Sequence, residues 1–161
     1  MKIYLVRHGK AADSGYPEDG HRPLTEMGRT LMRQTAKAWA KRGKEPERWL
    51  VSPLVRAVQT CEICVEAFGS DRPVEVTTAL IPEARVSAAT ALFEGGDESI
   101  AVVSHEPLLS ALASYLLEGE FSDFKKGMVM SLETRDEGPA RLRWILEPAR
   151  ESHDPRFREE L

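Results

Sequence analysis

Short runs of apolar residues recur along this chain of 161 residues, and longer stretches with helical spacing separate them. Three runs, Ile3 to Val6, Trp49 to Val51 and Ile100 to Val103, are wholly apolar. A run of this kind, without polar alternation, is typical of a strand that is buried on both faces of a parallel sheet. Val74 to Val76 is a further strand candidate. These runs predict the parallel part of a sheet.

Between the runs, apolar residues recur every three or four positions, as on one face of an α-helix. Thr25 is the expected N-cap of the first helix, Pro53 opens the second and Pro107 starts the last. A short helix from Ser87 to Phe93 stops before a glycine pair. The first helix carries the apolar residues Met27, Leu31, Ala38 and Trp39, and the second has an apolar stripe of Leu54, Ala57, Val58, Cys61, Val65 and Phe68. In the last helix, the residues predicted to face inward are Leu108, Leu109, Leu112, Tyr115 and Leu116.

Towards the end of the chain the pattern changes to strand period. Met128 to Leu132 and Leu142 to Leu146 flank a turn at residues 136–139, which predicts a hairpin at the sheet edge. The predicted fold class is therefore α/β: a three-layer α/β/α sandwich whose sheet is mostly parallel with an antiparallel edge strand. We expect one domain over residues 1–147, because the chain is too short for two, and a charged, poorly ordered tail over residues 148–161.

Composition narrows the possible partners. The net charge of -4 and the pI near 5.6 provide no general attraction to nucleic acid or to an anionic membrane, so an anion must be bound by a local group of cations. The first apolar run is too short for a signal peptide or a membrane span, and we expect a cytoplasmic protein. The pattern predicts no particular oligomeric state.

Cys61 and Cys64 form a C-x-x-C, which suggests a redox pair or half of a metal site. Both cysteines, however, lie well inside a predicted helix and continue its apolar stripe, and the chain has no second cysteine pair for zinc. Core packing is the favoured interpretation.

Candidate chemistry gathers where three predicted strands end. Arg7 and His8 follow the first run, Ser52 follows the second and His105 follows the last. Because ligands of open α/β sheets bind beyond the carboxyl ends of the strands, we expect these residues to converge. Arg56 lies in the first turn of its helix, where side chains lean back towards the same edge.

This set of side chains suits phosphoryl transfer. Arg7 and Arg56 can hold phosphoryl oxygens bidentately, and His105 adds a donor. His8 is the candidate nucleophile, provided that its attacking nitrogen is neutral, and neighbouring cations disfavour its protonation. We expect no metal and no other cofactor, since the arginines supply the charge that magnesium supplies elsewhere.

Each of these residues also has a plain structural interpretation, as a surface cation or a hydrogen-bonded histidine. Their convergence at one sheet edge favours the site for Arg7, His8, Arg56 and His105 together. His21 and His153 are expected to be merely exposed. Arg22 remains balanced between the loop surface and a substrate contact.

Three motifs resemble the histidine phosphatase superfamily, which includes the phosphoglycerate mutases. They are Arg7-His8-Gly9, Ser52-Pro53-x-x-Arg56-Ala57-x-Gln59-Thr60 and Ser104-His105. The short chain and the segment Arg22-Pro23-Leu24-Thr25-x-x-Gly28 are similar to the small SixA-type phosphohistidine phosphatases. The resemblance covers about residues 2 to 147 and implies a phosphoglycerate mutase-like fold.

By this resemblance, His8 carries the phosphoryl group, Arg7, Arg56 and His105 complete the phosphate pocket, and Arg22 contacts substrate. Larger relatives place a general acid after the strand that corresponds to Val74 to Thr78, where this chain has Glu83. Glu83 is therefore either this acid or a solvated loop residue, and a good leaving group has less need of the acid.

The leading hypothesis is a metal-independent phosphatase that dephosphorylates phosphohistidine on a protein through a phosphohistidine intermediate. Only about 20 residues separate Glu83 from His105, too few for a lid that encloses a small metabolite. The alternatives are a phosphatase of small phosphate monoesters or nucleotides and, from another class, a non-catalytic phospho-binding module. A mutase is disfavoured because it must keep its intermediate away from water.

Overall fold

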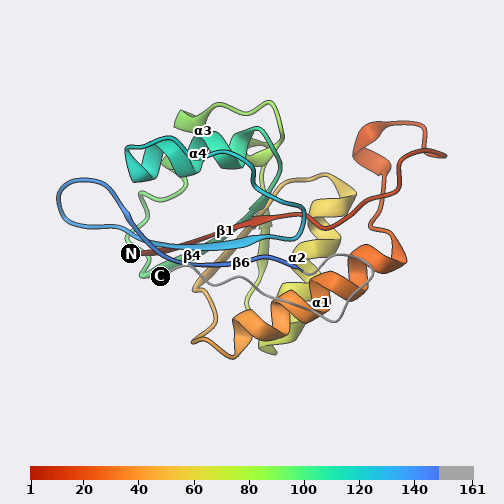
Figure 1. The fold of residues 1–161 in the computed structure, drawn as a ribbon, viewed down its shortest axis with the longest axis horizontal. Coiled ribbons are helices and arrows are strands. Elements are labelled where there is room, and N and C mark those ends of the chain that lie inside the picture. Colours follow the sequence, from red (N-terminus) through yellow and green to blue (C-terminus); the bar gives the residue numbers. More distant parts are fainter. Residues whose placement is uncertain (149–161) are drawn as a thin grey trace.

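The computed structural model describes residues 1–148, which form a six-stranded sheet between two layers of helices (Figure 1). The strands are β1 (Lys2–Arg7), β2 (Arg48–Val51), β3 (Val74–Val76), β4 (Ser99–Ser104), β5 (Val129–Glu133) and β6 (Arg141–Leu146). The α-helices are α1 (Glu26–Ala40), α2 (Val55–Phe68), α3 (Val86–Ala91) and α4 (Leu108–Leu117). Two three-residue 3-10 turns, η1 (Asp19–His21) and η2 (Thr78–Leu80), complete the elements. The predicted α/β sandwich is confirmed.

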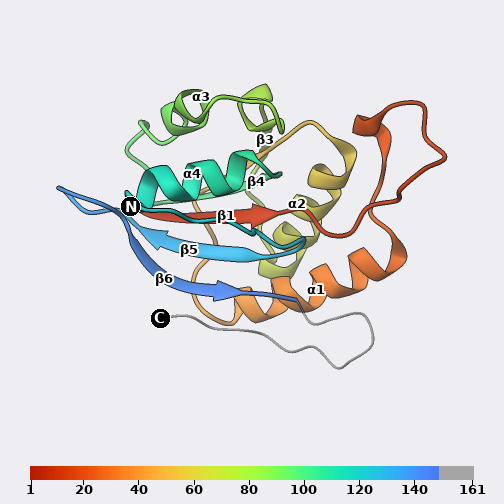
Figure 2. The same ribbon diagram turned by 45° about the horizontal axis from the view of Figure 1, so that its top comes forward.

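The strand order in the sheet is β3-β2-β4-β1-β5-β6. Strands β1 to β4 pair in parallel, whereas β5 is antiparallel to both of its neighbours. The predicted hairpin does end the sheet, but the antiparallel strand is β5, one position inside the edge. The edge strand β6 reverses direction again at the hairpin and therefore runs parallel to β1 (Figure 2).

Alternate residues of the central strands pack on opposite faces of the sheet, which explains their wholly apolar sequences. Ile3 and Leu5 lie in the core beneath α3 and α4, while Tyr4 and Val6 lie in the core beneath α1 and α2. The two pairs of helices are on opposite sides of the sheet in Figure 2. Both faces are thereby covered, as the sequence predicts.

The helices are confirmed, but the apolar residues of the first helix are not all buried, and the predicted inward face of the last helix needs correction. In α1 the buried residues are Gly28, Met32, Thr35, Ala36 and Trp39, and Met27 is exposed. In α4, Tyr115 is exposed because it lies about 90° around the helix from the middle of its buried stripe, at about 100° per residue. The spacing of apolar residues therefore predicts where a helix forms more reliably than it predicts which of its residues are buried.

The start of α1 is defined by Thr25, whose side-chain oxygen accepts a hydrogen bond from the backbone N–H of Gly28 at 2.9 Å. No helix within residues 1–148 is both long and apolar enough to cross a membrane. The predicted charged tail and His153 lie outside the described residues, apart from Pro148.

Candidate active site

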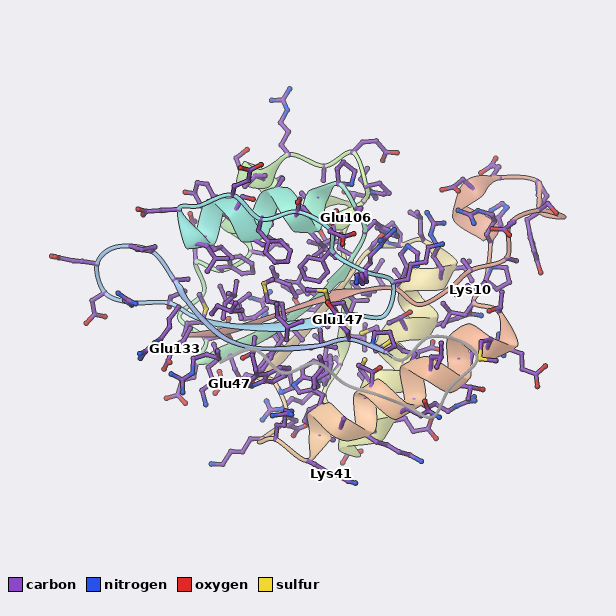
Figure 3. The ribbon with its side chains drawn as sticks, in the orientation of Figure 1. Lys10, Lys41, Glu47, Glu106, Glu133 and Glu147 are labelled. Carbon is purple, nitrogen blue, oxygen red and sulfur yellow. The ribbon has the colours of Figure 1, made fainter. Side chains whose placement is uncertain are left out.

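The predicted site residues meet where β1, β2 and β4 end. Arg7 pairs with Ser104 in the parallel register of β1 and β4, so that His8 and His105 leave the sheet side by side. Figure 3 labels Lys10 and Glu106 beyond this end of β1, and Glu47 and Glu133 towards the opposite end of the sheet. The convergence expected from chain order is present in the structure.

His8 is buried, and its Nδ1 lies 2.7 Å from the carbonyl oxygen of Gly9. A carbonyl only accepts, so Nδ1 carries the proton and Nε2 holds the lone pair. Burial lowers the pKa of His8 to about 4, and the nearby charges of Arg56 and Arg7 add to this effect, whereas the bond to Gly9 opposes it. At neutral pH the imidazole is therefore a neutral base with a nucleophilic Nε2.

Arg7 is held by the segment that leads into β5. Its Nη1 donates to the carbonyl oxygen of Phe124 at 2.5 Å, and the backbone N–H of Gly127 donates to the carbonyl oxygens of both Arg7 and His8. Burial lowers the pKa of Arg7, while the negative charge of Glu106 acts in the opposite direction. Glu106 is itself oriented by the backbone N–H and hydroxyl of Ser110.

Arg56 lies in the first turn of α2 and is 4% exposed. Its Nη1 donates to the carbonyl oxygen of Asp19 at 2.8 Å, and its Nη2 pairs with Oδ2 of the same residue at 2.9 Å. A planar guanidinium can present two parallel donors in this way to a carboxylate or to a phosphoryl group.

His105 is 2% exposed, and its Nε2 lies 2.7 Å from Oγ of Ser52. Burial lowers the pKa of His105 to about 3, and the charges of His8, Arg56 and Arg7 contribute, while that of Asp19 opposes them. His105 is therefore also neutral at pH 7. The hydroxyl of the adjacent Ser104 donates to the carbonyl oxygen of Leu80 and ties η2 to the end of β4.

Three buried nitrogen atoms of these residues have no hydrogen-bond partner among the described residues: Nε of Arg7, Nε of Arg56 and Nδ1 of His105. Buried polar atoms are rarely left unpartnered in folded proteins. Their concentration in three residues around His8 indicates a site that is chemically suited to an anion.

Other motif residues hold the loops of the site in place. The hydroxyl of Thr60 donates to the carbonyl oxygen of Arg56 and accepts the backbone N–H of Gly9 at 3.2 Å. The side-chain oxygen of Gln59 accepts the backbone N–H of Leu24 at 2.7 Å. The bonds to Gly9 and Leu24 attach the loops on either side of η1 to α2. They explain why the motif that contains Arg56 continues to Gln59 and Thr60.

The structure places Arg22 and Glu83 differently with respect to this site. Arg22 donates to Oδ1 of Asp19 through Nε at 3.0 Å and Nη2 at 2.7 Å, and to the carbonyl oxygen of Ala12 through Nη1. It is thus linked to Arg56 through Asp19. Glu83 is exposed in the turn between η2 and α3 and makes no hydrogen bond or ion pair with the described residues.

Two charged residues near the pocket were missed by sequence reasoning. Asp19 bridges both arginines, and the charge of Lys126 is among those that lower the pKa of His8. Asp19 comes three positions before Arg22 in an otherwise polar loop, so only the motif that begins at Arg22 pointed towards it. Lys126 adjoins the Gly127 that binds His8, and nothing local to its sequence marks it.

Cys61 and Cys64 are buried and unpaired, as the stripe predicted. Burial raises the pKa of Cys61 to about 12 and that of Cys64 well above its usual range, so neither is a reactive thiolate at neutral pH. Within residues 1–148, no three side chains of His, Cys, Asp or Glu are grouped so that they could bind a metal ion.

A cavity of about 1200 Å³ lies at the opposite end of the sheet, lined by residues that include Lys2, Ser99 and Trp144. Its charged lining is of both signs and partly paired, as in the ion pair between Arg143 and Glu133. This lining offers no preference for an anion, so we place the candidate chemistry at the His8 edge.

Comparison with known proteins shows the family of this chain. Residues 3–82 match the family model described as histidine phosphatase superfamily (branch 1). The phosphohistidine phosphatase SixA of Escherichia coli (strain K12) is 33% identical over 154 residues, which cover 92% of this chain and 94% of the relative.

Two solved structures are also similar. The protein histidine phosphatase SixA complexed with tungstate has a TM-score of 0.83 at 31% identity and covers 90% of this chain and 96% of its own. A putative phosphohistidine phosphatase SixA from Agrobacterium tumefaciens has a TM-score of 0.81 at 27% identity and covers 91% of this chain and 97% of its own. This chain belongs to the histidine phosphatase superfamily and is a phosphatase, as the motifs predicted.

Proposed function

We propose that this phosphatase removes the phosphoryl group from phosphohistidine on a protein, through a covalent intermediate on His8. The observation that carries the mechanism is the hydrogen bond from Nδ1 of His8 to the carbonyl oxygen of Gly9, which leaves Nε2 unprotonated. The similarity to SixA over nearly the whole chain supports the substrate.

In the first step, the lone pair of His8 Nε2 attacks phosphorus, and the bond from phosphorus to the leaving nitrogen of the substrate breaks. That nitrogen keeps the electron pair of the broken bond and takes up a proton from solvent. In the second step, water attacks the phosphorylated His8, inorganic phosphate leaves, Nε2 regains its lone pair, and a proton of the attacking water returns to solvent. Arg7 and Arg56 stabilise the negative charge on the three phosphoryl oxygens in both steps.

His105 and Ser52 assist the same step. His105 is neutral, and a hydrogen bond between its Nε2 and the Ser52 hydroxyl orients the ring beside His8. We assign it a donor role towards a phosphoryl oxygen once substrate is bound. Because His8, Ser52 and His105 are all buried, little reorganisation is needed when charge develops on the phosphoryl group.

The short segment between Ile81 and His105 favours a phosphoryl group carried by a protein as the substrate. Between Ile81 and His105, the chain forms only α3 and β4, and neither is a long insertion able to cover the pocket. A protonated imidazole is a good leaving group, which fits the exposed position of Glu83. We retain Arg22 as a substrate contact, since Asp19 binds both the guanidinium of Arg22 and that of Arg56.

The proposal is tested by single-turnover and steady-state assays of one preparation against a phosphohistidine protein and against a panel of small monoesters and nucleotides. We expect kcat/KM for the phosphohistidine protein to exceed that of the best monoester by about 100-fold or more, equivalent to about 2.7 kcal/mol in the transition state. Activity should survive a metal chelator. A preference for a monoester would overturn the substrate, and binding without turnover of any of them would indicate a phospho-binding module.

A further inference from the structure

One residue, Asp19, accepts hydrogen bonds from both terminal nitrogens of Arg56. Nη1 donates to its carbonyl oxygen at 2.8 Å, and Nη2 donates to its carboxylate oxygen Oδ2 at 2.9 Å. The second carboxylate oxygen, Oδ1, accepts two hydrogen bonds from Arg22. Asp19 therefore presents two oxygen acceptors to the two terminal nitrogens of Arg56, as two oxygens of a phosphoryl group would.

The two partners of this contact differ in how firmly they are held. The side chain of Arg56 is 5% exposed and projects from a helix of 14 residues. The side chain of Asp19 is 63% exposed and belongs to a three-residue turn, and residues 13–18 before it are all exposed. Figure 1 shows this loop projecting from the body of the protein beyond the end of β1. Of the two, Asp19 is the partner that can move at low cost.

We propose that Asp19 is the internal competitor of the substrate: the phosphoryl group replaces it on Arg56, and the same exchange releases Arg22 to contact the substrate. This inference rests on the proposed role of Arg56 as a phosphoryl ligand. Two phosphoryl oxygens take over Nη1 and Nη2, and the carboxylate is expelled because a dianion and a carboxylate repel each other at this distance. The bonds that break and form are hydrogen bonds, so no covalent step is involved.

The exchange makes the pocket selective for charge. Because Asp19 is part of the chain, its effective concentration at Arg56 is high, and any ligand has to displace it. A monoanion such as a carboxylate would replace the single charge of Asp19 with another single charge, so it would gain little binding free energy. A dianionic phosphoryl group brings an additional charge, which Arg7, Arg56 and the released Arg22 share. Asp19 is thus a specificity-determining residue.

The test uses inorganic phosphate as the probe, at a pH where it is a dianion, and calorimetry of Asp19→Asn, Asp19→Ala and the parent protein. Removal of the competing charge should tighten phosphate binding by about tenfold, which corresponds to about 1.4 kcal/mol. Glu18→Gln is the matched control, since Glu18 is the neighbouring exposed carboxylate and its Oε2 lies 4.0 Å from Nε2 of His21. It should bind phosphate as the parent does.

Thermal unfolding is a second measurement. Without phosphate, the loss of Asp19 should lower the melting temperature, although it tightens phosphate binding. Without Asp19 the buried Arg56 lacks its counter-charge, so Asp19→Asn should melt at a lower temperature than the parent in phosphate-free buffer. Added phosphate should then raise its melting temperature more than that of the parent. The Nε–H signal of Arg22 in ¹⁵N NMR should shift with phosphate in the parent, and should already lie near the shifted position in Asp19→Asn.

Unchanged or weaker phosphate binding in both Asp19 variants would overturn the proposal and make Asp19 a positioning residue for Arg56. An Arg22 signal that ignores phosphate would overturn the release of Arg22. Failure of the proposed function looks different: the phosphohistidine protein would not be hydrolysed, while the Asp19 variants would still bind inorganic phosphate more tightly than the parent.

Discussion

The imidazole rings of His8 and His105 lie with their centroids 5.0 Å apart and their planes at 53°, and neither is hydrogen-bonded to a carboxylate within residues 1–148. Their partners are a carbonyl oxygen and a hydroxyl, on Gly9 and Ser52. Many catalytic histidines are oriented by an acidic group, which raises their basicity. Here burial is the main cause that keeps both rings neutral; the two nearby arginines add to it, and no carboxylate bond opposes it.

This pair predicts a pH dependence of stability. The folded pKa values, about 4 for His8 and about 3 for His105, lie below the usual 6.5, so the unfolded chain binds more protons than the folded one between these values. Stability should be complete above pH 6.5 and fall as the pH decreases towards 4, by up to about 1.4 kcal/mol per pH unit for each histidine. Urea unfolding at a series of pH values measures this.

The matched variant for that measurement is His8→Asn, which keeps a polar side chain but cannot titrate. About half of the loss between pH 6.5 and pH 4.5 should disappear in it. If His8→Asn and the parent lost stability in parallel, the buried histidines would not be the source of the pH dependence.

His8 should carry the phosphoryl group during turnover. Brief incubation with labelled substrate should leave acid-labile, base-stable phosphate on the protein. His8→Ala should abolish both the label and the turnover, because Nε2 of the other neutral imidazole, His105, is hydrogen-bonded to Ser52. His21→Ala, which removes an exposed histidine of the neighbouring loop, is the control and should retain the label. Label retained by His8→Ala would contradict the assignment.

Arg56→Lys keeps a positive charge but removes the planar pair of donors. We expect kcat to fall by well over tenfold while inorganic phosphate still binds weakly, since loss of one such donor in comparable sites costs about 10²-fold or more. Arg72→Lys is the comparison, because Arg72 forms an ion pair with Glu45 and also lies on the wall of the cavity at the far end of the sheet. Equal activities of Arg56→Lys and the parent would remove Arg56 from the site.

Glu83→Gln separates the two interpretations of this carboxylate. Because Glu83 is exposed and without a partner among the described residues, we expect hydrolysis of aryl and alkyl phosphates to change alike and by less than about twofold. A loss of about 10²-fold confined to alkyl phosphates would make Glu83 the general acid and favour a small-molecule phosphomonoesterase.

Gly28 is required by a close backbone contact, which Gly28→Ala would disturb. A Cβ at this position would overlap the carbonyl oxygen of Lys10, which also accepts a hydrogen bond from the backbone of Thr25. Alanine normally stabilises a helix by about 1 kcal/mol relative to glycine, but here the overlap should outweigh this gain and give a net loss of about 1–3 kcal/mol.

The loop that contains Lys10 also carries His8, so kcat should fall in Gly28→Ala as well. Gly43→Ala is the control, because its Cβ would meet no atom within 4 Å, and stability should change by less than about 0.5 kcal/mol. An equal effect of the two substitutions in urea unfolding would refute the overlap at Gly28.

Several features of this protein were determined by the sequence itself. The wholly apolar runs and the helical spacing between them predicted β1 to β4 and the four α-helices, because burial and periodicity are local properties of the chain. Parallel strands that end at one edge then brought His8 and His105 together without knowledge of any contact.

Only the tertiary structure decided how the site is held. The bonds of Asp19 to Arg56 and of Thr60 to Gly9 join residues 37 and 51 positions apart. Nothing in the neighbouring sequence of either partner specifies the other, because these contacts depend on how η1 and the loop after β1 meet α2 in space. The same reason applies to β5: its periodicity predicted a strand, but its place one position inside the sheet edge follows from its pairing with both β1 and β6.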